Sequence, residues 1–487
     1  MTRCPEILIT GATGTMGMAT LREWASRRGD CRVTVLARPS KANRRKLAPY
    51  AGPGFRVEWG DLCDYDAVAR AMASADYVLH LGGMVTPLTE YHPEQAFRVN
   101  ITAARNVARA ASAISRERPV RVINMGSVAQ LGDRLPPRHW GREGDPVCPA
   151  LYDAYSLSKI LAEREIAEGC SAPWISLRQT GILSPEMLLK GTDPITFHVP
   201  LAGVLEWTTV EDSARLLINI GVSDPDPSFW GHFYSIGGGE SYRLINYEFE
   251  SRLLAALRCP PPEKIFDPYW FALRNFHGVW WADSDRLEEL VPYRSAMSCD
   301  DYFHHLAKGT PWWMRLTPLV PPYFIKKMMW GVARKPHSPL RAIFDDDRRQ
   351  IEAMFGHHRK WLCIPLWDEE LEILRKAAGD APHPRVPDAG ALLPHGYDED
   401  KPAGRLDIGD MRDKAAFEGG ECLSTEMTPG DLYTPLKWRC KEGHVFEASP
   451  ALVLRGGHWC PYCLTAASGM STPLLSAHPE YVKYPKM

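Results

Sequence analysis

The chain has 487 residues, of which 45% are hydrophobic and 24% are charged, and its formal net charge is −2 at pH 7. A chain of this length is too long to fold around one small hydrophobic core, so we expect two or three domains. The composition is that of a soluble globular protein. The balanced charge gives no general reason to expect nucleic acid or an anionic membrane as a partner. We find neither a secretory signal pattern nor an apolar run long enough for a membrane span, and the cysteines are mostly isolated, which predicts a cytoplasmic protein.

A glycine-rich turn, Thr10 to Gly17, lies between a predicted strand and a predicted helix at the start of the chain. Gly11 permits a tight turn, Gly14 lets a pyrophosphate approach the backbone, and Gly17 lets the helix pack on the strand. The phosphates would lie at the helix N-terminus, where free N–H groups and the helix dipole favour anions. The residues of this predicted dinucleotide site are Gly11, Thr13, Gly14, Thr15, Met16 and Gly17.

The end of the second predicted strand, residues 31–38, indicates which dinucleotide binds. In βαβ units an acidic residue at this place hydrogen-bonds a ribose 2′-OH, whereas an arginine accommodates a 2′-phosphate. This strand ends in Arg38, more basic residues follow, and no acid is present. The pattern favours NADP(H), with NAD(H) as the alternative; a solvated helix start is the plainer interpretation.

Three further apolar runs, residues 55–59, 77–81 and 120–125, read as strands, and residues 93–115 read as a helix. This alternation predicts an α/β fold with a doubly wound, Rossmann-type parallel sheet. In such sheets ligands bind beyond the carboxyl ends of the strands. The small residues at 82–83, which follow one strand, would let a cofactor lie across this edge.

Ser127 ends the last of these strands, and Tyr155 and Lys159 follow in a predicted helix over residues 155–166. Residues four apart lie on one helix face, so the lysine ammonium would favour the phenolate and lower the pKa of Tyr155. A phenol tuned in this way can exchange a proton with a substrate oxygen near neutral pH, and Ser127 could hydrogen-bond the same oxygen. Each motif is common alone, but their order along the chain predicts a catalytic set.

Residues 1–307 resemble the extended short-chain dehydrogenase/reductase family, which includes the nucleotide-sugar epimerase/dehydratase group. The motifs that carry the resemblance are residues 10–17, 60–62, 80–83, 99–100, 126–132, 155–159, 176–182 and 209–212. The resemblance implies a Rossmann core at about residues 1–180 and segments of a smaller substrate domain at about 181–307.

The resemblance also implies roles for individual residues. Tyr155 would be the general acid/base, Lys159 would hold the nicotinamide ribose and tune Tyr155, and Ser127 would polarise the substrate carbonyl. Asp61 would hydrogen-bond the adenine with Leu62 beside it. Further cofactor contacts would come from Leu81 and Gly82.

Three departures from the family pattern concern the shape of the pocket and the type of reaction. Relatives usually have alanines at residues 82–83 and proline at Gln179, so the pocket near the nicotinamide is expected to differ. The family's sugar dehydratases use a Thr-Asp-Glu triplet, where this chain has Ser127-Val128-Ala129. Without those acids, dehydration is disfavoured.

We therefore expect an NADP(H)-dependent oxidoreductase that interconverts a secondary alcohol and a ketone. The first alternative is a nucleotide-sugar-type epimerase with transient oxidation. The second alternative is a non-catalytic, cofactor-sensing binding protein, against which the intact catalytic set argues.

The second half of the chain predicts three further segments. Residues 308–378 read as a mostly helical extension, and residues 379–403, rich in Pro, Gly, Asp and His, read as a linker. Aromatic residues are dense from Phe266 to Trp313. They favour a core that joins the extension to the main domain over a pocket for a large apolar substrate.

Residues 404–487 are expected to form a small zinc-binding module, similar to treble-clef or zinc-ribbon modules. Cys-x3-His and Cys-x2-Cys pairs suit tetrahedral Zn²⁺, and a closed set of four ligands is structural rather than catalytic. The predicted ligands are Cys440, His444, Cys460 and Cys463, with His458 as an alternate. Local charge does not require nucleic acid, so an interaction module that caps the active site or a homodimer partner is expected first.

Overall fold

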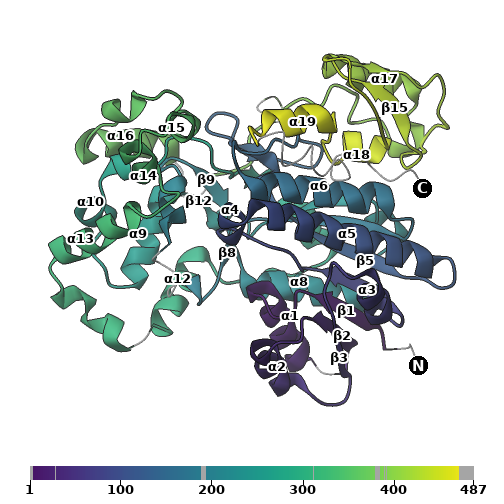
Figure 1. Cartoon of the computed structure of the whole chain (residues 1–487), viewed down its shortest axis with the longest axis horizontal. Coiled ribbons are helices and arrows are strands. Elements are labelled where there is room, and N and C mark those ends of the chain that lie inside the picture. The colour runs from purple at the N-terminus through teal and green to yellow at the C-terminus, as the bar shows by residue number, and fades with distance from the viewer. Residues whose placement is uncertain are drawn as a thin grey trace.

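The centre of the molecule is a seven-stranded parallel sheet (Figure 1). The computed structural model describes residues 4–27, 29–187, 193–310, 312–378, 384–388, 390 and 392–470. The sheet has the strand order β11-β7-β5-β4-β1-β2-β3. The strands are β1 (Glu6–Thr10), β2 (Arg32–Ala37), β3 (Phe55–Trp59), β4 (Tyr77–His80), β5 (Arg121–Ser127), β7 (Trp174–Gln179) and β11 (His232–Ile236).

Helices bury both faces of this sheet. Because successive side chains of a strand point to opposite faces, Leu8 belongs to one core cluster while Ile7 and Ile9 belong to the other. Helices α3 (Tyr65–Met72), α5 (Pro93–Ser115) and α6 (Ala154–Gly169) cover the first face, and α1 (Thr15–Ser26) and α8 (Val210–Ser223) cover the second. The predicted doubly wound α/β fold is confirmed.

The strand order predicts at which edge of the sheet a ligand would bind. From β1 the chain runs outward to β2 and β3, and it then returns to β4 on the other side of β1. This reversal opens a crevice at the carboxyl ends of β1 and β4, which is where open α/β sheets bind ligands. The glycine turn and residues 81–83 both lie at this edge.

A smaller lobe is built from segments that follow β7. It contains β8 (Ile182–Leu183), β9 (Val204–Glu206), β10 (Thr208–Thr209), β12 (Arg243–Ile245), α9 (Asn246–Ala256) and α12 (Cys299–Lys308). Helix α11 (Ser284–Leu290) instead packs on β11, and its Leu287 belongs to the core of the main sheet. Helices α13 (Pro322–Ala333), α14 (Pro339–Phe344), α15 (Arg348–Phe355) and α16 (Trp367–Ala378) pack against the smaller lobe. Trp270 is 1% exposed, and its ring lies 5.4 Å from that of Trp330 in α13. This member of the aromatic-rich segment Phe266 to Trp313 therefore joins the helical extension to the lobe.

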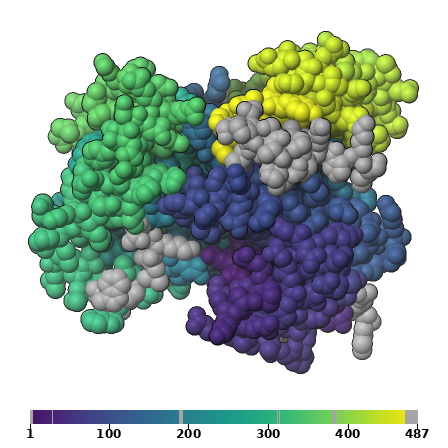
Figure 2. Space-filling view, viewed as in Figure 1, coloured from purple at the N-terminus to yellow at the C-terminus, as the bar shows by residue number. Residues whose placement is uncertain are grey.

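The C-terminal part forms a separate small layer on α6 (Figures 1 and 2). It contains α17 (Ile408–Phe417), β14 (Glu421–Cys422), β15 (Leu436–Arg439), β16 (Val445–Ala448), α18 (Pro450–Leu454) and α19 (Pro461–Ala467). The three strands pair antiparallel around Trp438, which is fully buried. In the part of the chain that the structure describes, no helix is both long and apolar enough to cross a membrane.

A buried ion pair and a histidine hydrogen bond fix this C-terminal layer to the domain that contains the seven-stranded sheet. Glu163 on α6 accepts from Arg178 Nη2 at 2.8 Å, and Glu163 Oε1 lies 3.0 Å from Nε2 of His458. All three side chains are at most 2% exposed. Burial alone would raise the pKa of Glu163, but Arg178 and His458 hold it at about 2. The carboxylate is therefore ionised and depends on its partners.

Replacing His458 with alanine is expected to lower the free energy of unfolding by about 1–3 kcal/mol, because a buried acceptor loses one of its donors. Urea unfolding of the full chain measures the change. His92, which is exposed, offers the matched control, and His92→Ala is expected to have little effect. Equal losses for the two variants would contradict the anchoring role of His458.

Candidate active site

The glycine turn forms a cradle that side chains would fill. Gly11 has φ +70°, and a Cβ placed on it would lie 2.6 Å from Cα of Gly82. A Cβ on Gly17 would lie 2.4 Å from Cα of Ala12. Gly14 is the N-cap of α1 and carries no capping side chain, which leaves the first-turn N–H groups free for a ligand. The cradle therefore fits a dinucleotide pyrophosphate.

The residues predicted to contact the adenosine end lie around this cradle. Arg38 is exposed directly after β2, and no acid ends that strand. Asp61 Oδ1 accepts from the Cys63 amide at 2.8 Å, while Leu62 packs so close to Gly82 that a Cβ there would lie 2.3 Å from Leu62 Cδ1. Arg44, part of the predicted basic cluster, is engaged over the Trp59 ring at 4.4 Å. Arg38 thus stays the candidate for a 2′-phosphate.

Ser127, Tyr155 and Lys159 line one cavity of about 470 Å³. Ser127 ends β5, and the other two lie one turn apart on α6. Met16 and Leu81 from the cofactor edge line the same cavity, so the predicted catalytic and cofactor residues are brought together.

The protonation of these groups is governed by burial. Burial raises the pKa of the Tyr155 phenol, and a hydrogen bond with Ser127 opposes this. Burial lowers the pKa of Lys159 to about 8, and the charge of Glu163 opposes this. Lys159 Nζ donates to the main-chain oxygen of Met125, so its action on Tyr155 stays a prediction.

Several residues of the cavity were not singled out from the sequence. They come from the smaller lobe and include Trp207, Phe249, Glu250 and His277. Trp207 and Phe249 stack with ring centroids 4.1 Å apart. No short motif marks these positions, because they reach the cavity only through tertiary packing.

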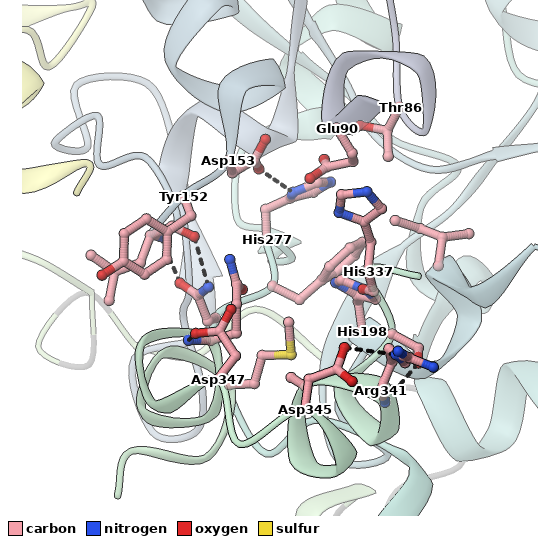
Figure 3. A pocket seen from close by; sticks show the side chains of 18 residues that line it. Thr86, Glu90, Tyr152, Asp153, His198, His277, His337, Arg341, Asp345 and Asp347 are labelled. Atoms are coloured by element: carbon pink, nitrogen blue, oxygen red, sulfur yellow. Dashed lines mark hydrogen bonds and ion pairs between the residues drawn. The ribbon is translucent and has the colours of Figure 1, made fainter. Parts of the chain in front are cut away.

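A second cavity of about 260 Å³ lies beside the first and shares Ile195, Phe276 and His277 with it (Figure 3). His277 Nδ1 lies 3.7 Å from Asp153 Oδ2, and Asp153 caps α6. Burial, together with the charges of Asp153 and Asp193, raises the pKa of Glu90 to about 8. This cavity is therefore polar and rich in acids.

The four predicted metal ligands converge. Their Sγ and Nδ1 atoms all lie within 4.8 Å of one another. His444 Nδ1 lies 3.4 Å from the Cys440 and Cys463 sulfurs and 3.6 Å from that of Cys460. Tetrahedral Zn²⁺ with its usual bond lengths places ligand atoms roughly 3.5–3.8 Å apart, so the set fits zinc. His458, the alternate ligand, instead pairs with Glu163.

Comparisons with known proteins match the N-terminal part of the chain. Residues 7–190 match the model of the NAD dependent epimerase/dehydratase family. A UDP-glucose 4-epimerase from Rickettsia bellii is 29% identical over 142 residues, covering 26% of this chain and 42% of the relative. A UDP-N-acetylglucosamine 4,6-dehydratase (inverting) from Campylobacter jejuni is 26% identical over 140 residues, covering 27% of this chain and 42% of the relative.

One solved structure is similar in fold over a larger part of this chain than the relatives above. The dTDP-glucose 4,6-dehydratase from Streptomyces venezuelae, solved with NAD, is 20% identical with a TM-score of 0.50, and covers 62% of this chain and 96% of that one. At this identity the likeness concerns the fold alone. The chain spans 42% of the length of the curated relatives named above. The family resemblance inferred from the motifs is confirmed.

We predict about one zinc ion per chain in the purified protein, because the four ligand atoms match one tetrahedral ion. Cys460→Ser is expected to abolish binding, since three protein ligands would then remain. Cys422, in the same module but outside the ligand set, gives the control variant Cys422→Ser. Elemental analysis measures the ratio, and a folded, zinc-free parent protein would refute the site.

Proposed function

We propose that this chain, in which residues 7–190 are a domain of the NAD dependent epimerase/dehydratase family, is an enzyme that removes and returns hydride at a secondary alcohol carbon. The observation that carries the proposal is the meeting of Ser127, Tyr155 and Lys159 in one cavity beside the glycine cradle. A binding protein that only senses cofactor would not require this set.

The residues divide the chemistry between them. Tyr155 takes the proton of the substrate hydroxyl as the carbon is oxidised, and it returns the proton on reduction. Ser127 hydrogen-bonds the same oxygen, and Lys159 supplies positive charge that favours the phenolate. A bound nicotinamide would supply the hydride acceptor. The surrounding walls are mostly apolar, which strengthens these electrostatic interactions at the reacting oxygen.

The comparisons favour transient oxidation within an epimerase cycle over the net oxidoreduction that we expected first. The relatives are a nucleotide-sugar epimerase and a dehydratase. Dehydration lacks support in this chain, because Val128 and Ala129 follow Ser127, are buried and carry no acid. Epimerisation of a secondary alcohol is therefore the proposed outcome, and a nucleotide sugar is the substrate class that the relatives suggest.

For the cofactor we propose NADP(H). The exposed Arg38 and the absence of an acid at the end of β2 support a 2′-phosphate contact. NAD(H), present in the Streptomyces structure, is the alternative.

Tyr155→Phe is expected to lower turnover by roughly 10²–10⁴-fold, because the acid/base is lost while the ring still fills its place. Turnover is followed through the cofactor's absorbance and through product formation, with UDP-glucose and with a panel of cyclic ketones and alcohols. Cofactor affinity should not change. Undiminished turnover in this variant would remove Tyr155 from the mechanism. Product formed without net cofactor change would distinguish the epimerase from a reductase.

The parent protein is expected to bind NADPH more tightly than NADH, and Arg38→Ala should narrow the difference by ~10-fold, since one charge-assisted contact to phosphate is lost. Calorimetric titration of both cofactors measures the change. Arg116, exposed at the distant end of α5, provides the control Arg116→Ala. Equal affinities of the parent for both cofactors would exclude the NADP(H) preference.

A further inference from the structure

The walls of the catalytic cavity are mostly apolar. Residues of this kind in its lining include Met84, Val128, Ile182, Leu205, Trp207 and Phe249. Among the described residues of the lining there is no arginine, and Lys159 is the single lysine. Lys159 already donates to Met125 O. Phosphates are normally bound by arginine, lysine or helix N-terminal N–H groups, so the described lining offers a substrate diphosphate no side-chain cation beyond the catalytic lysine.

The neighbouring cavity is no better suited to a diphosphate. Its lining holds four acidic residues, Glu90, Asp153, Asp345 and Asp347, and one arginine (Figure 3). That arginine, Arg341, pairs with Asp345 at 2.7 Å. The described lining therefore offers a phosphate neither a lysine nor an arginine that is free of a carboxylate partner.

One buried carboxyl interrupts the apolar walls. Glu250 on α9 lines the catalytic cavity and is 5% exposed. Its carboxyl has no hydrogen-bond or ion-pair partner among the described residues. Asn246 and Phe249, on the same face of α9, also line the cavity, so this helix presents Glu250 to the cavity rather than to solvent.

Chemistry defines what Glu250 can bind. Burial raises the pKa of Glu250 to about 8, so at neutral pH the carboxyl is mostly protonated and can both donate and accept a hydrogen bond. An unpaired carboxyl among apolar side chains lowers the stability of the fold, whereas a leucine side chain at this position would not. A ligand hydroxyl or carbonyl would complete the missing hydrogen bonds.

We propose that the substrate is a compact, mainly apolar secondary alcohol with a second hydrogen-bonding group, that its ketone is the transient oxidised form, and that Glu250 selects it by binding the second group. This inference rests on the proposed hydride-transfer function and departs from the nucleotide sugars of the relatives. The apolar walls bind the body of the substrate, and Tyr155 and Ser127 bind the reacting oxygen.

The test compares binding of three probes to the cofactor-saturated protein by calorimetry. The probes are phenylcyclohexanone, its para-hydroxy analogue and UDP-glucose. The parent should bind the hydroxy analogue ~10-fold more tightly than phenylcyclohexanone, the gain of about one good hydrogen bond, and UDP-glucose more weakly than either. Equal affinity for the two ketones, no binding of either, or tighter binding of UDP-glucose would overturn the proposal.

Variants assign the effect to Glu250. Glu250→Leu should abolish the preference for the hydroxy analogue, whereas Glu250→Gln, which keeps a donor and an acceptor, should retain most of it. Glu289→Gln on the exposed surface of α11 is the control and should bind like the parent. A preference that survives in Glu250→Leu would show that another residue selects the substrate.

The unfolding temperature tests, without any ligand, whether the carboxyl of Glu250 lacks a partner. Because the folded-state pKa of Glu250, about 8, exceeds its ordinary value of 4.5, the native state keeps a proton that the unfolded chain releases between these pH values. The group therefore lowers the parent's stability as pH rises through this range. Glu250→Leu should raise the unfolding temperature, and more at neutral pH than at about pH 5. An unchanged temperature would contradict an unpartnered carboxyl.

Turnover separates this inference from the proposed function. Tyr155→Phe should weaken the binding of both ketones to the same extent, because each loses the same hydrogen bond, and should keep the preference for the hydroxy analogue. If the hydroxy analogue binds through Glu250 but the parent exchanges hydride with neither this analogue nor UDP-glucose, the proposed function fails while the binding inference stands. If hydride transfer occurs with UDP-glucose alone, the proposed function stands and the inference fails.

Discussion

The position of helix α6, which carries Tyr155 and Lys159, depends on the buried carboxylate of Glu163. This carboxylate is fully buried, and its charge is compensated by Arg178 from the sheet and by a hydrogen bond with His458 from the C-terminal layer. Removing a partner of a buried charge costs far more than a surface pair contributes. Strand β7, helix α6 and the C-terminal layer are therefore held in one relative position, and that position sets where α6 presents Tyr155 and Lys159.

This constraint gives a physical reason for the C-terminal layer on this enzyme domain. Arg164 donates to Glu447 O at 2.7 Å, and Glu168 accepts from Ser449 Oγ at 2.7 Å, so successive turns of α6 bind the layer. His458 precedes Cys460 by two residues, and a metal held by the four ligands would fix the segment that carries it. A structural ion in this place would stabilise the support of the active site without taking part in its chemistry.

The sequence predicted the elements that have strong local signals. The helix at residues 93–115 follows its 3.6-residue pattern, and the glycine turn follows from positions where side chains cannot fit. Local signals also predicted that Ser127, Tyr155 and Lys159 belong to one site, whose catalytic roles remain proposals.

Burial and tertiary partners have no such local signal. Glu250 reads as an ordinary helical glutamate until α9 is placed against the cavity. Within the predicted linker, His395 is 2% exposed and its Nε2 lies 2.9 Å from Asp145 Oδ1. Composition could not reveal that packing.

Burial of the candidate site shifts the pKa values of its groups, and the C-terminal layer affects one of these shifts through Glu163. The same burial raises the pKa values of Tyr155 and Glu250 and lowers that of Lys159, so each group is pushed towards its neutral form. The proton transfer that we propose for Tyr155 requires the opposite, a phenolate stabilised by a charged lysine. The negative charge of Glu163, one turn beyond Lys159, favours the ammonium form, and Glu163 stays ionised because Arg178 compensates its charge and His458 hydrogen-bonds it. The C-terminal layer thus supports the charge state of Lys159 as well as the position of its helix.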